Sequence, residues 1–159
     1  MKCKIAVVQF DIKQHSPKEN LEKAEKFIVK ASDQKADIIV FPEDFITGPL
    51  LGKTEFADSN KTYLKHFQKL ARKYNINIVP GSYIEKNKFG LYNTTHYIDK
   101  SGEIKSNYRK INLWHPEKKE LNPGHKISVF KTEFGRIGLV ICSDLMYPEL
   151  IRKNKMQCC

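Results

Sequence analysis

The rest of the chain is organised around one short run, residues 136–150, which reads RIGLVICSDLMYPEL. An apolar segment rich in β-branched residues ends at Cys142, polar residues follow, and Pro148 then stands where it can open a helix. The pattern predicts a strand, a sharp turn and a helix. Open α/β sheets present reactive groups at such strand ends, and we expect the helix to favour the thiolate form of Cys142. A cysteine in this position is more often a small buried apolar residue, so a functional interpretation depends on the rest of the chain.

Composition limits the class of protein. The chain has 159 residues, of which 40% are hydrophobic, and this predicts one globular domain over residues 1–159. The sequence has no run of 18 apolar residues, and residues 1–10 lack the long apolar centre of a signal peptide. We therefore expect a cytoplasmic protein with no membrane partner.

Charge and cysteine spacing exclude two further classes. The net charge is +10, but the lysines are scattered over helical faces and loops, which indicates solvated surface rather than a nucleic-acid partner. The four cysteines, at positions 3, 142, 158 and 159, have neither metal-site spacing nor the density of a disulfide scaffold. We expect reduced thiols and no metal site.

The first half of the chain predicts a strand, a helix and a second strand. Residues 4–10 form an apolar run typical of a buried strand, with Cys3 at its start. Ser16, followed by Pro17 and Glu19, predicts a capped helix that continues to residue 31. Residues 37–43 predict another buried strand, and the resulting unit implies a right-handed parallel crossover. Glu43 would then lie at a strand's carboxyl end, although a carboxylate there is more often a loop residue or a helix cap.

The second half predicts more sheet than helix. Residues 46–52 form a loop without a phosphate-binding motif, and residues 61–74 have the spacing of an amphipathic helix. A third strand is predicted over residues 76–84, and residues 90–98 and 104–110 flank a turn like the strands of a β-hairpin, which makes the sheet mixed. We interpret Asn93 and His96, in the first of these hairpin strands, as structural hydrogen-bonding groups. Two later strands are predicted over residues 126–131 and 137–141, within a single layered α/β domain.

Three segments together resemble a known family. They are residues 41–43 (FPE), residues 108–113 (YRKINL), and residues 142–144 (CSD) with 147–150 (YPEL). In order and approximate spacing they resemble the nitrilase superfamily of carbon–nitrogen hydrolases. The resemblance covers about residues 4–152 and includes noncatalytic positions: 7–9, 81–82, 92–94, 99, 102 and 122–124.

The resemblance implies an αββα sandwich and a Glu–Lys–Cys catalytic triad that hydrolyses nonpeptide amides, ureides or nitriles without a metal or organic cofactor. Matched residue by residue, Glu43, Lys110 and Cys142 would form that triad. On the residues alone, Lys110 is equally a surface charge. The family's additional glutamate is matched by Glu117, with Glu120 as the second choice.

The chemistry of amide cleavage requires such a set of groups. A thiolate must form beside the carbonyl carbon, the oxyanion must be stabilised, and the amine must leave protonated. We expect a desolvated Glu43 to move the proton, and Lys110 with the backbone N–H of Ser143 to hold the oxyanion. Glu117 would orient substrate or support Lys110. Trp114, Tyr147 and the loop over residues 47–51 suit an acyl pocket and plain core packing equally well.

The expected reaction is hydrolysis of a small aliphatic amide or an N-carbamoyl compound through a cysteine thioester. Two alternatives stay open: an amide-forming acyltransferase of the same superfamily, and a noncatalytic subunit or binding protein that retains the fold. The family's fold continues beyond the position of Leu150, so we expect its C-terminal part to be missing here, through truncation, a frameshift or a partial sequence. We also expect the 159-residue form to be inactive and poorly stable, and a full-length form to be a homo-oligomer.

Overall fold

The computed structural model describes residues 2–158, with side chains to residue 153. Its elements in chain order are β1 (Ile5–Val7), α1 (Pro17–Asp33), β2 (Ile38–Val40), η1 (Thr54–Phe56), α2 (Thr62–Tyr74), β3 (Asn77–Val79), β4 (Tyr83–Asn87), β5 (Gly90–Ile98), β6 (Ile104–Arg109), η2 (Glu117–Lys119), β7 (Ser128–Thr132), β8 (Gly135–Leu139), η3 (Cys142–Met146) and α3 (Pro148–Cys158), where η marks a short 3-10 helix.

A six-stranded mixed sheet forms the centre of the molecule. β1, β2 and β3 run parallel, with Ile38 of β2 opposite Ile5 of β1 and Asn77 of β3. β5 runs antiparallel to β3 and β4 along one edge and to β6 along the other. The predicted parallel strand–helix–strand unit and the predicted hairpin, now β5 and β6, are confirmed.

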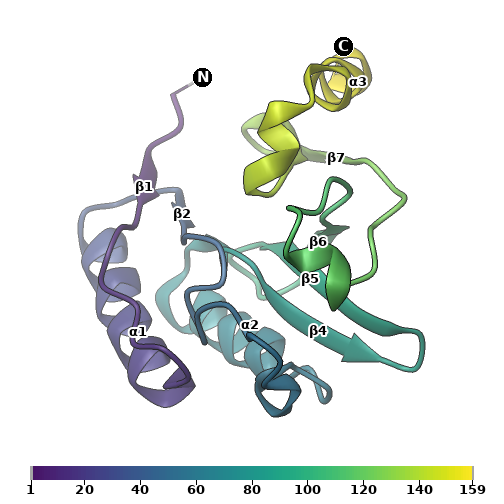
Figure 1. The fold of residues 1–159 in the computed structure, drawn as a ribbon. Coiled ribbons are helices and arrows are strands. Elements are labelled where there is room, and N and C mark those ends of the chain that lie inside the picture. Colours follow the sequence, from purple (N-terminus) through teal and green to yellow (C-terminus); the bar gives the residue numbers. More distant parts are fainter. Residues whose placement is uncertain (1, 159) are drawn as a thin grey trace.

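Layers cover both faces of this sheet (Figure 1). α1 and α2 pack side by side on one face, over a core that includes Ile28, Phe67 and Leu70. The antiparallel β7–β8 hairpin covers Tyr97 and Tyr108 on the other face, and α3 contacts the hairpin. The layers therefore follow the order helix, sheet, sheet, helix, which confirms the predicted α/β class and sandwich.

The first strand is not buried as predicted. β1 is an edge strand, and Ile5 and Val7 are 54% and 80% exposed, whereas Val8 is buried. Side chains alternate along a strand, so one set of this apolar run points to the helices and the other to solvent. Cys3 precedes β1 and is exposed as well. Because both sets are apolar, the run lacks the alternation that would have revealed the exposed face.

Other boundaries differ from the prediction for local reasons. The predicted strand over residues 76–84 is interrupted between β3 and β4, where Gly81 takes a φ of +54°. α1 starts after Ser16, but the Ser16 side chain does not cap the helix; its hydroxyl donates to the carbonyl of Gln14 instead. Glu19 pairs with exposed Lys13 rather than closing a capping box. The last two predicted strands are shifted by about two residues, to β7 and β8.

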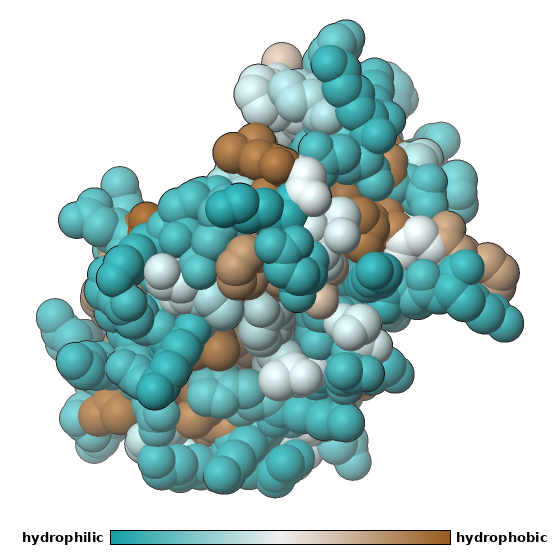
Figure 2. Space-filling model, turned by 60° about the horizontal axis from the view of Figure 1, so that its bottom comes forward, coloured by the Kyte–Doolittle hydropathy of each residue, from teal (hydrophilic) through white to brown (hydrophobic). Residues whose placement is uncertain are grey.

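The face of the molecule drawn in Figure 2 is mostly hydrophilic. On the face drawn in Figure 2, hydrophobic residues form separate patches among hydrophilic ones. Within residues 2–158, no helix combines the length and the apolar character that a bilayer crossing needs.

Candidate active site

Glu43 is positioned by a close backbone approach. It lies three residues beyond the end of β2, and Phe41 still donates to the carbonyl of Val79, at 3.0 Å. A Cβ atom on Gly81 would lie 1.9 Å from the carbonyl oxygen of Pro42. Only glycine therefore lets this segment pack against the turn after β3, and the packing directs Glu43 into the site.

Lys110 is a buried cation held by two carboxylates. Its side chain is 1% exposed, and Nζ lies 2.8 Å from Glu43 Oε1 and 2.7 Å from Glu117 Oε2. Burial lowers the pKa of Lys110, but the bonds and charges of Glu117 and Glu43 outweigh it, so the pKa is raised overall. An ammonium has three N–H donors. Two are used by the carboxylates, and one remains for a substrate oxygen.

Asn93 joins the two carboxylates. Its Nδ2 donates to Glu43 Oε1 and to Glu117 Oε1, each at 2.9 Å. Asn93 is a hydrogen-bonding group, as interpreted, but its partners are the two carboxylates of the site. The predicted hairpin could have indicated this, because it pairs the strand of Asn93 with the strand that leads to Lys110. His96 does match that interpretation: it is buried 3.3 Å from the Tyr83 hydroxyl, and burial lowers its pKa to about 4.

Cys142 occupies a sharp turn. It is the first residue of η3, it has a φ of +43°, and it is exposed. Three groups act on the pKa of its thiol: the carboxylate of Glu43, the ammonium of Lys110 and the backbone N–H of Ser143. Partial burial, together with the bond and charge of Glu43, raises the pKa of Cys142, while Lys110 and the Ser143 N–H only partly oppose the rise.

The expectation of a helix-stabilised thiolate is therefore wrong for the free site. η3 is a short 3-10 helix, and the longer helix begins only at Pro148, so no long helix dipole starts at the sulfur. The thiol keeps its proton at neutral pH, and a base must remove it during the reaction. Glu43, whose side chain is 28% exposed and so only partly desolvated, is the carboxylate in contact with it.

Asp144 ties the two halves of the site together. It is fully buried and accepts hydrogen bonds from the Tyr108 hydroxyl at 2.7 Å, the Asn112 N–H at 2.8 Å and the Ile141 N–H at 3.0 Å. These donors flank Lys110 on one side and Cys142 on the other. The sequence analysis placed Asp144 in a motif but gave it no role. The only further signal is that an acidic residue follows closely after a predicted strand.

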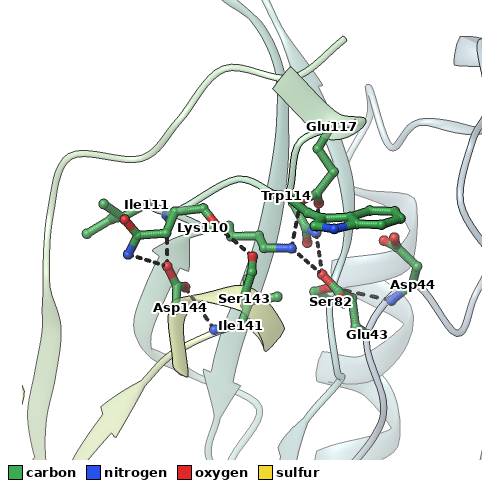
Figure 3. A network of polar contacts seen from close by, with 12 residues as sticks. Glu43, Asp44, Ser82, Lys110, Ile111, Trp114, Glu117, Ile141, Ser143 and Asp144 are labelled. Atoms are coloured by element: carbon green, nitrogen blue, oxygen red, sulfur yellow. Dashed lines mark hydrogen bonds and ion pairs between the residues drawn. The ribbon is translucent and has the colours of Figure 1, made fainter. Parts of the chain in front are cut away.

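Figure 3 shows the side chains of Glu43 and Glu117 converging on Lys110. These three residues and Cys142 line one cavity of about 630 Å³. It is lined by Glu43, Asp44, Pro49, Leu50, Leu51, Ile84, Lys110, Trp114, Pro116, Glu117, Glu120, Leu121, Cys142, Ser143 and Met146. Within the described part of the chain, no group of three or more His, Cys, Asp or Glu residues is placed to hold a metal ion.

The predicted site residues divide into those inside and outside this cavity. Trp114 lines the cavity, although its side chain is largely exposed. Ser143 lines it as well, and its hydroxyl donates to the carbonyl of Asn112. Of the two candidates for the additional glutamate, Glu117 pairs with Lys110. Glu120 also lines the cavity, but its carboxylate accepts a hydrogen bond from the Gly52 N–H instead. Tyr147 is half exposed and is not among the residues that line the cavity.

Of the loop over residues 47–51, only part reaches the cavity. Pro49, Leu50 and Leu51 line it. Thr47 does not: it is buried, and its hydroxyl donates to the carbonyl of Gly48. Met146, which the sequence analysis did not single out and which precedes Tyr147 in the chain, lines the cavity.

Comparison with known proteins gives consistent relatives. A model of the carbon–nitrogen hydrolase family matches residues 4–158. The 2-oxoglutaramate amidase of Bacillus subtilis is 37% identical over 158 residues, which cover 97% of this chain and 61% of that protein. The omega-amidase NIT2 of Homo sapiens is 32% identical, over 92% of this chain and 57% of that protein.

A solved structure gives the same result for the fold. Saccharomyces cerevisiae Nit3, a member of branch 10 of the nitrilase superfamily, superposes with a TM-score of 0.87 and 28% sequence identity. The match covers 98% of this chain and 60% of that one. The chain thus spans about three fifths of the length of the relatives that it matches.

Proposed function

Because the chain belongs to the carbon–nitrogen hydrolase family, we propose that its site hydrolyses a small aliphatic amide or N-carbamoyl compound through a thioester on Cys142. The observation that carries the proposal is the convergence of Cys142, Glu43 and Lys110 on one cavity, with Glu117 as the second carboxylate on the lysine. The relatives that act on amides favour an amide substrate.

The first half-reaction forms the thioester. Glu43 takes the thiol proton, the sulfur attacks the carbonyl carbon, and the C=O bond pair moves to oxygen. The remaining N–H of Lys110 and the backbone N–H of Ser143 stabilise the oxyanion, each contributing about 3 kcal/mol when well placed. The intermediate then collapses, the C–N bond breaks, and Glu43 returns the proton to the leaving nitrogen.

The second half-reaction releases the acid. Glu43 is again ionised, so it removes a proton from a water molecule, whose oxygen attacks the thioester. The C–S bond breaks, the carboxylic acid leaves, and the thiol regains the proton. One base serves both halves: the proton that Glu43 takes from water returns to the thiolate once the C–S bond has broken, and the raised pKa of Cys142 favours that return.

Glu117 and Asn93 position the reacting groups. Glu117 forms the second ion pair of Lys110. Its Oε2 also accepts a hydrogen bond from the Trp114 N–H at 2.7 Å. Asn93 holds Glu43 Oε1 in place from the opposite side. Both residues fix the ammonium and the base relative to one another, which limits the reorganisation needed in the transition state.

The reaction is tested with a panel of aliphatic amides and N-carbamoyl amines, using ammonia release as the readout. We expect ammonia release by a full-length form of the protein and none by its Cys142→Ala variant. Addition of a primary amine acceptor distinguishes acyl transfer, because a transferase would form an N-alkyl amide in place of the free acid. Absence of both products with every substrate would favour a noncatalytic binding protein.

A further inference from the structure

Asp44 lies next to Glu43 in the chain and lines the same cavity, yet the reaction above does not use it. Its Oδ1 is buried and has no hydrogen-bond partner among the described residues. Figure 3 shows the carboxyl group on the side of Glu43 away from Lys110, directed toward the indole of Trp114. Buried carboxylate oxygens are normally hydrogen-bonded, so an unpaired one that borders a cavity is a candidate ligand-binding group.

The charges around Asp44 define what it would bind. The cavity holds the carboxylates Glu43, Asp44, Glu117 and Glu120, but its one cation, Lys110, is already paired with Glu43 and Glu117. Burial and the charges of Glu43 and Glu117 raise the pKa of Asp44 to about 8, against the opposing effect of Lys110. An anionic group on the substrate would be repelled here, and a cationic group would be attracted.

We infer that Asp44 binds a positively charged group of the substrate, a primary ammonium at the end of the acyl chain remote from the bond that is cleaved. The inference rests on the proposed function, because it names the substrate class of the same site. Leu50, Leu51, Ile84 and Leu121 supply apolar walls for the methylene groups between the ammonium and the amide. The ammonium would satisfy the carboxylate oxygen that lacks a partner.

Binding of such a ligand should depend on pH. The ammonium binds the ionised form of Asp44, so below the pKa of about 8 the carboxyl must first lose a proton, which weakens binding. Affinity therefore rises between pH 6 and pH 9. The charged groups that act on Asp44 are Glu43, Glu117 and Lys110. Two further titratable residues, Glu120 and Cys142, line the same cavity. Cys142→Ala removes the thiol, which would otherwise titrate at alkaline pH.

The test uses the Cys142→Ala chain and three ligands with the same four methylene groups: 5-aminopentanamide, hexanamide and 5-carbamoylpentanoate. Trp114 is the sole tryptophan of the sequence and lines the cavity, so its fluorescence reports binding. We expect 5-aminopentanamide to bind at least about tenfold more tightly than hexanamide, and the carboxylate ligand to bind most weakly.

Asp44→Asn should abolish the preference for the ammonium and its pH dependence while hexanamide binds as before. Asparagine tolerates the φ of +50° at this position, so the variant should keep its backbone. Glu120→Gln, which removes another carboxylate of the same cavity, should retain the preference. Loss of the preference in Glu120→Gln but not in Asp44→Asn would overturn the assignment to Asp44.

The three ligands also separate failure of this inference from failure of the proposed function. If hexanamide binds and 5-aminopentanamide has no advantage, the cation site is wrong and the amide site stands; this comparison needs no change at Asp44. If the anionic amide binds best, the charge argument is refuted. If no amide changes the fluorescence, both the inference and the proposed function fail.

Discussion

The pKa of the Cys142 thiol tests whether Glu43 is the catalytic base or only a loop residue. Glu43 raises the pKa of Cys142 through a hydrogen bond and its charge, after the larger effect of partial burial. Glu43→Gln removes that charge, so Cys142 should become thiolate at lower pH and react faster with iodoacetamide at neutral pH. Amide turnover should nevertheless fall by about 10²- to 10⁴-fold, because the proton carrier is lost.

Mass spectrometry of alkylated peptides over a pH series measures this shift. Cys3 serves as an internal reference: it is exposed, and its own raised pKa reflects burial, Asp37 and Glu133 rather than Glu43. The assignment of Glu43 as base is refuted if the variant keeps turnover within about threefold of the wild type.

The buried lysine gives a second prediction at this scale. Lys110→Met leaves the partly buried carboxylates of Glu43 and Glu117 without their cation, which should destabilise the fold by about 3–5 kcal/mol at pH 7. The two carboxylates, both held beside the same ammonium in the wild type, would then repel each other.

Urea unfolding at pH 7 is the measurement. Lys105→Met is the matched control, because Lys105 pairs with Asp99 and Glu103 at the surface and should change stability by less than about 1 kcal/mol. Equal effects of the two substitutions would show that the buried ion pairs do not hold the site together.

At the residue scale, the family resemblance named Glu43, Lys110 and Cys142, three groups that the fold brings to one cavity. The apolar patterns alone placed Glu43 and Cys142 at strand ends but left Lys110 as a surface charge. The sequence analysis could not assign Asn93 or Asp144, whose importance comes from partners 50 and 36 positions away in the chain. It also misjudged the Cys142 pKa, since that depends on which charge lies closest to the sulfur.

Among the elements, the turn between β3 and β4 has the most direct effect on the site. Gly81→Ala would add a methyl group 1.9 Å from the Pro42 carbonyl oxygen and would also strain the φ of +54°. The segment that carries Glu43 must then move, and a shift of about 1 Å can cost a hundredfold in rate. We expect a turnover loss of that order, measured as ammonia release.

Gly135→Ala is the control for backbone strain alone. Gly135 has a φ of +113°, but an added Cβ there meets nothing within 4 Å. It should lower stability by about 1–2 kcal/mol and leave turnover nearly unchanged. If the two alanine variants lose the same fraction of activity, the close approach at Gly81 does not position Glu43.

The helices and strands also show which element bounds can be predicted from the sequence pattern. α1, α2 and the β5–β6 hairpin have clear periodicity or turn residues, and the predictions agree with the structure within about two residues. β3 and β4 were merged because Gly81 reads as a permissive strand residue until its neighbour Pro42 is known. The burial of β1 was mispredicted because edge position is a property of the whole sheet.

For the molecule as a whole, the outer side of the edge strand β1 leaves apolar side chains open to solvent. Val7→Lys should change stability by less than about 0.5 kcal/mol and reduce self-association, because a charged edge strand resists pairing with another chain. Val8→Lys should destabilise by about 3 kcal/mol or more, since Val8 is buried. Thermal melting and light scattering measure both effects; equal melting losses would mean that Val7 is covered.

The chain covers about 60% of its relatives' length, so the expectation that the 159-residue form is inactive and poorly stable stays a prediction. Molecular size, cooperativity of melting and turnover of the purified chain test it. A sharply melting monomer with steady turnover would refute it. The first half-reaction can be tested on the 159-residue chain by itself, because every group that it requires lies within the described residues.

Acylation of Cys142 is therefore the most direct measurement of the central claim. The chain is mixed with an amide substrate, quenched in acid at short times, digested and analysed by mass spectrometry. We predict an acyl thioester on the peptide that contains Cys142, one equivalent of ammonia for each adduct, no adduct on Cys3, and slower formation in Glu43→Gln. Ammonia release without an adduct on Cys142, or acylation of Cys3 at the same rate, would contradict the assignment of Cys142 as the nucleophile.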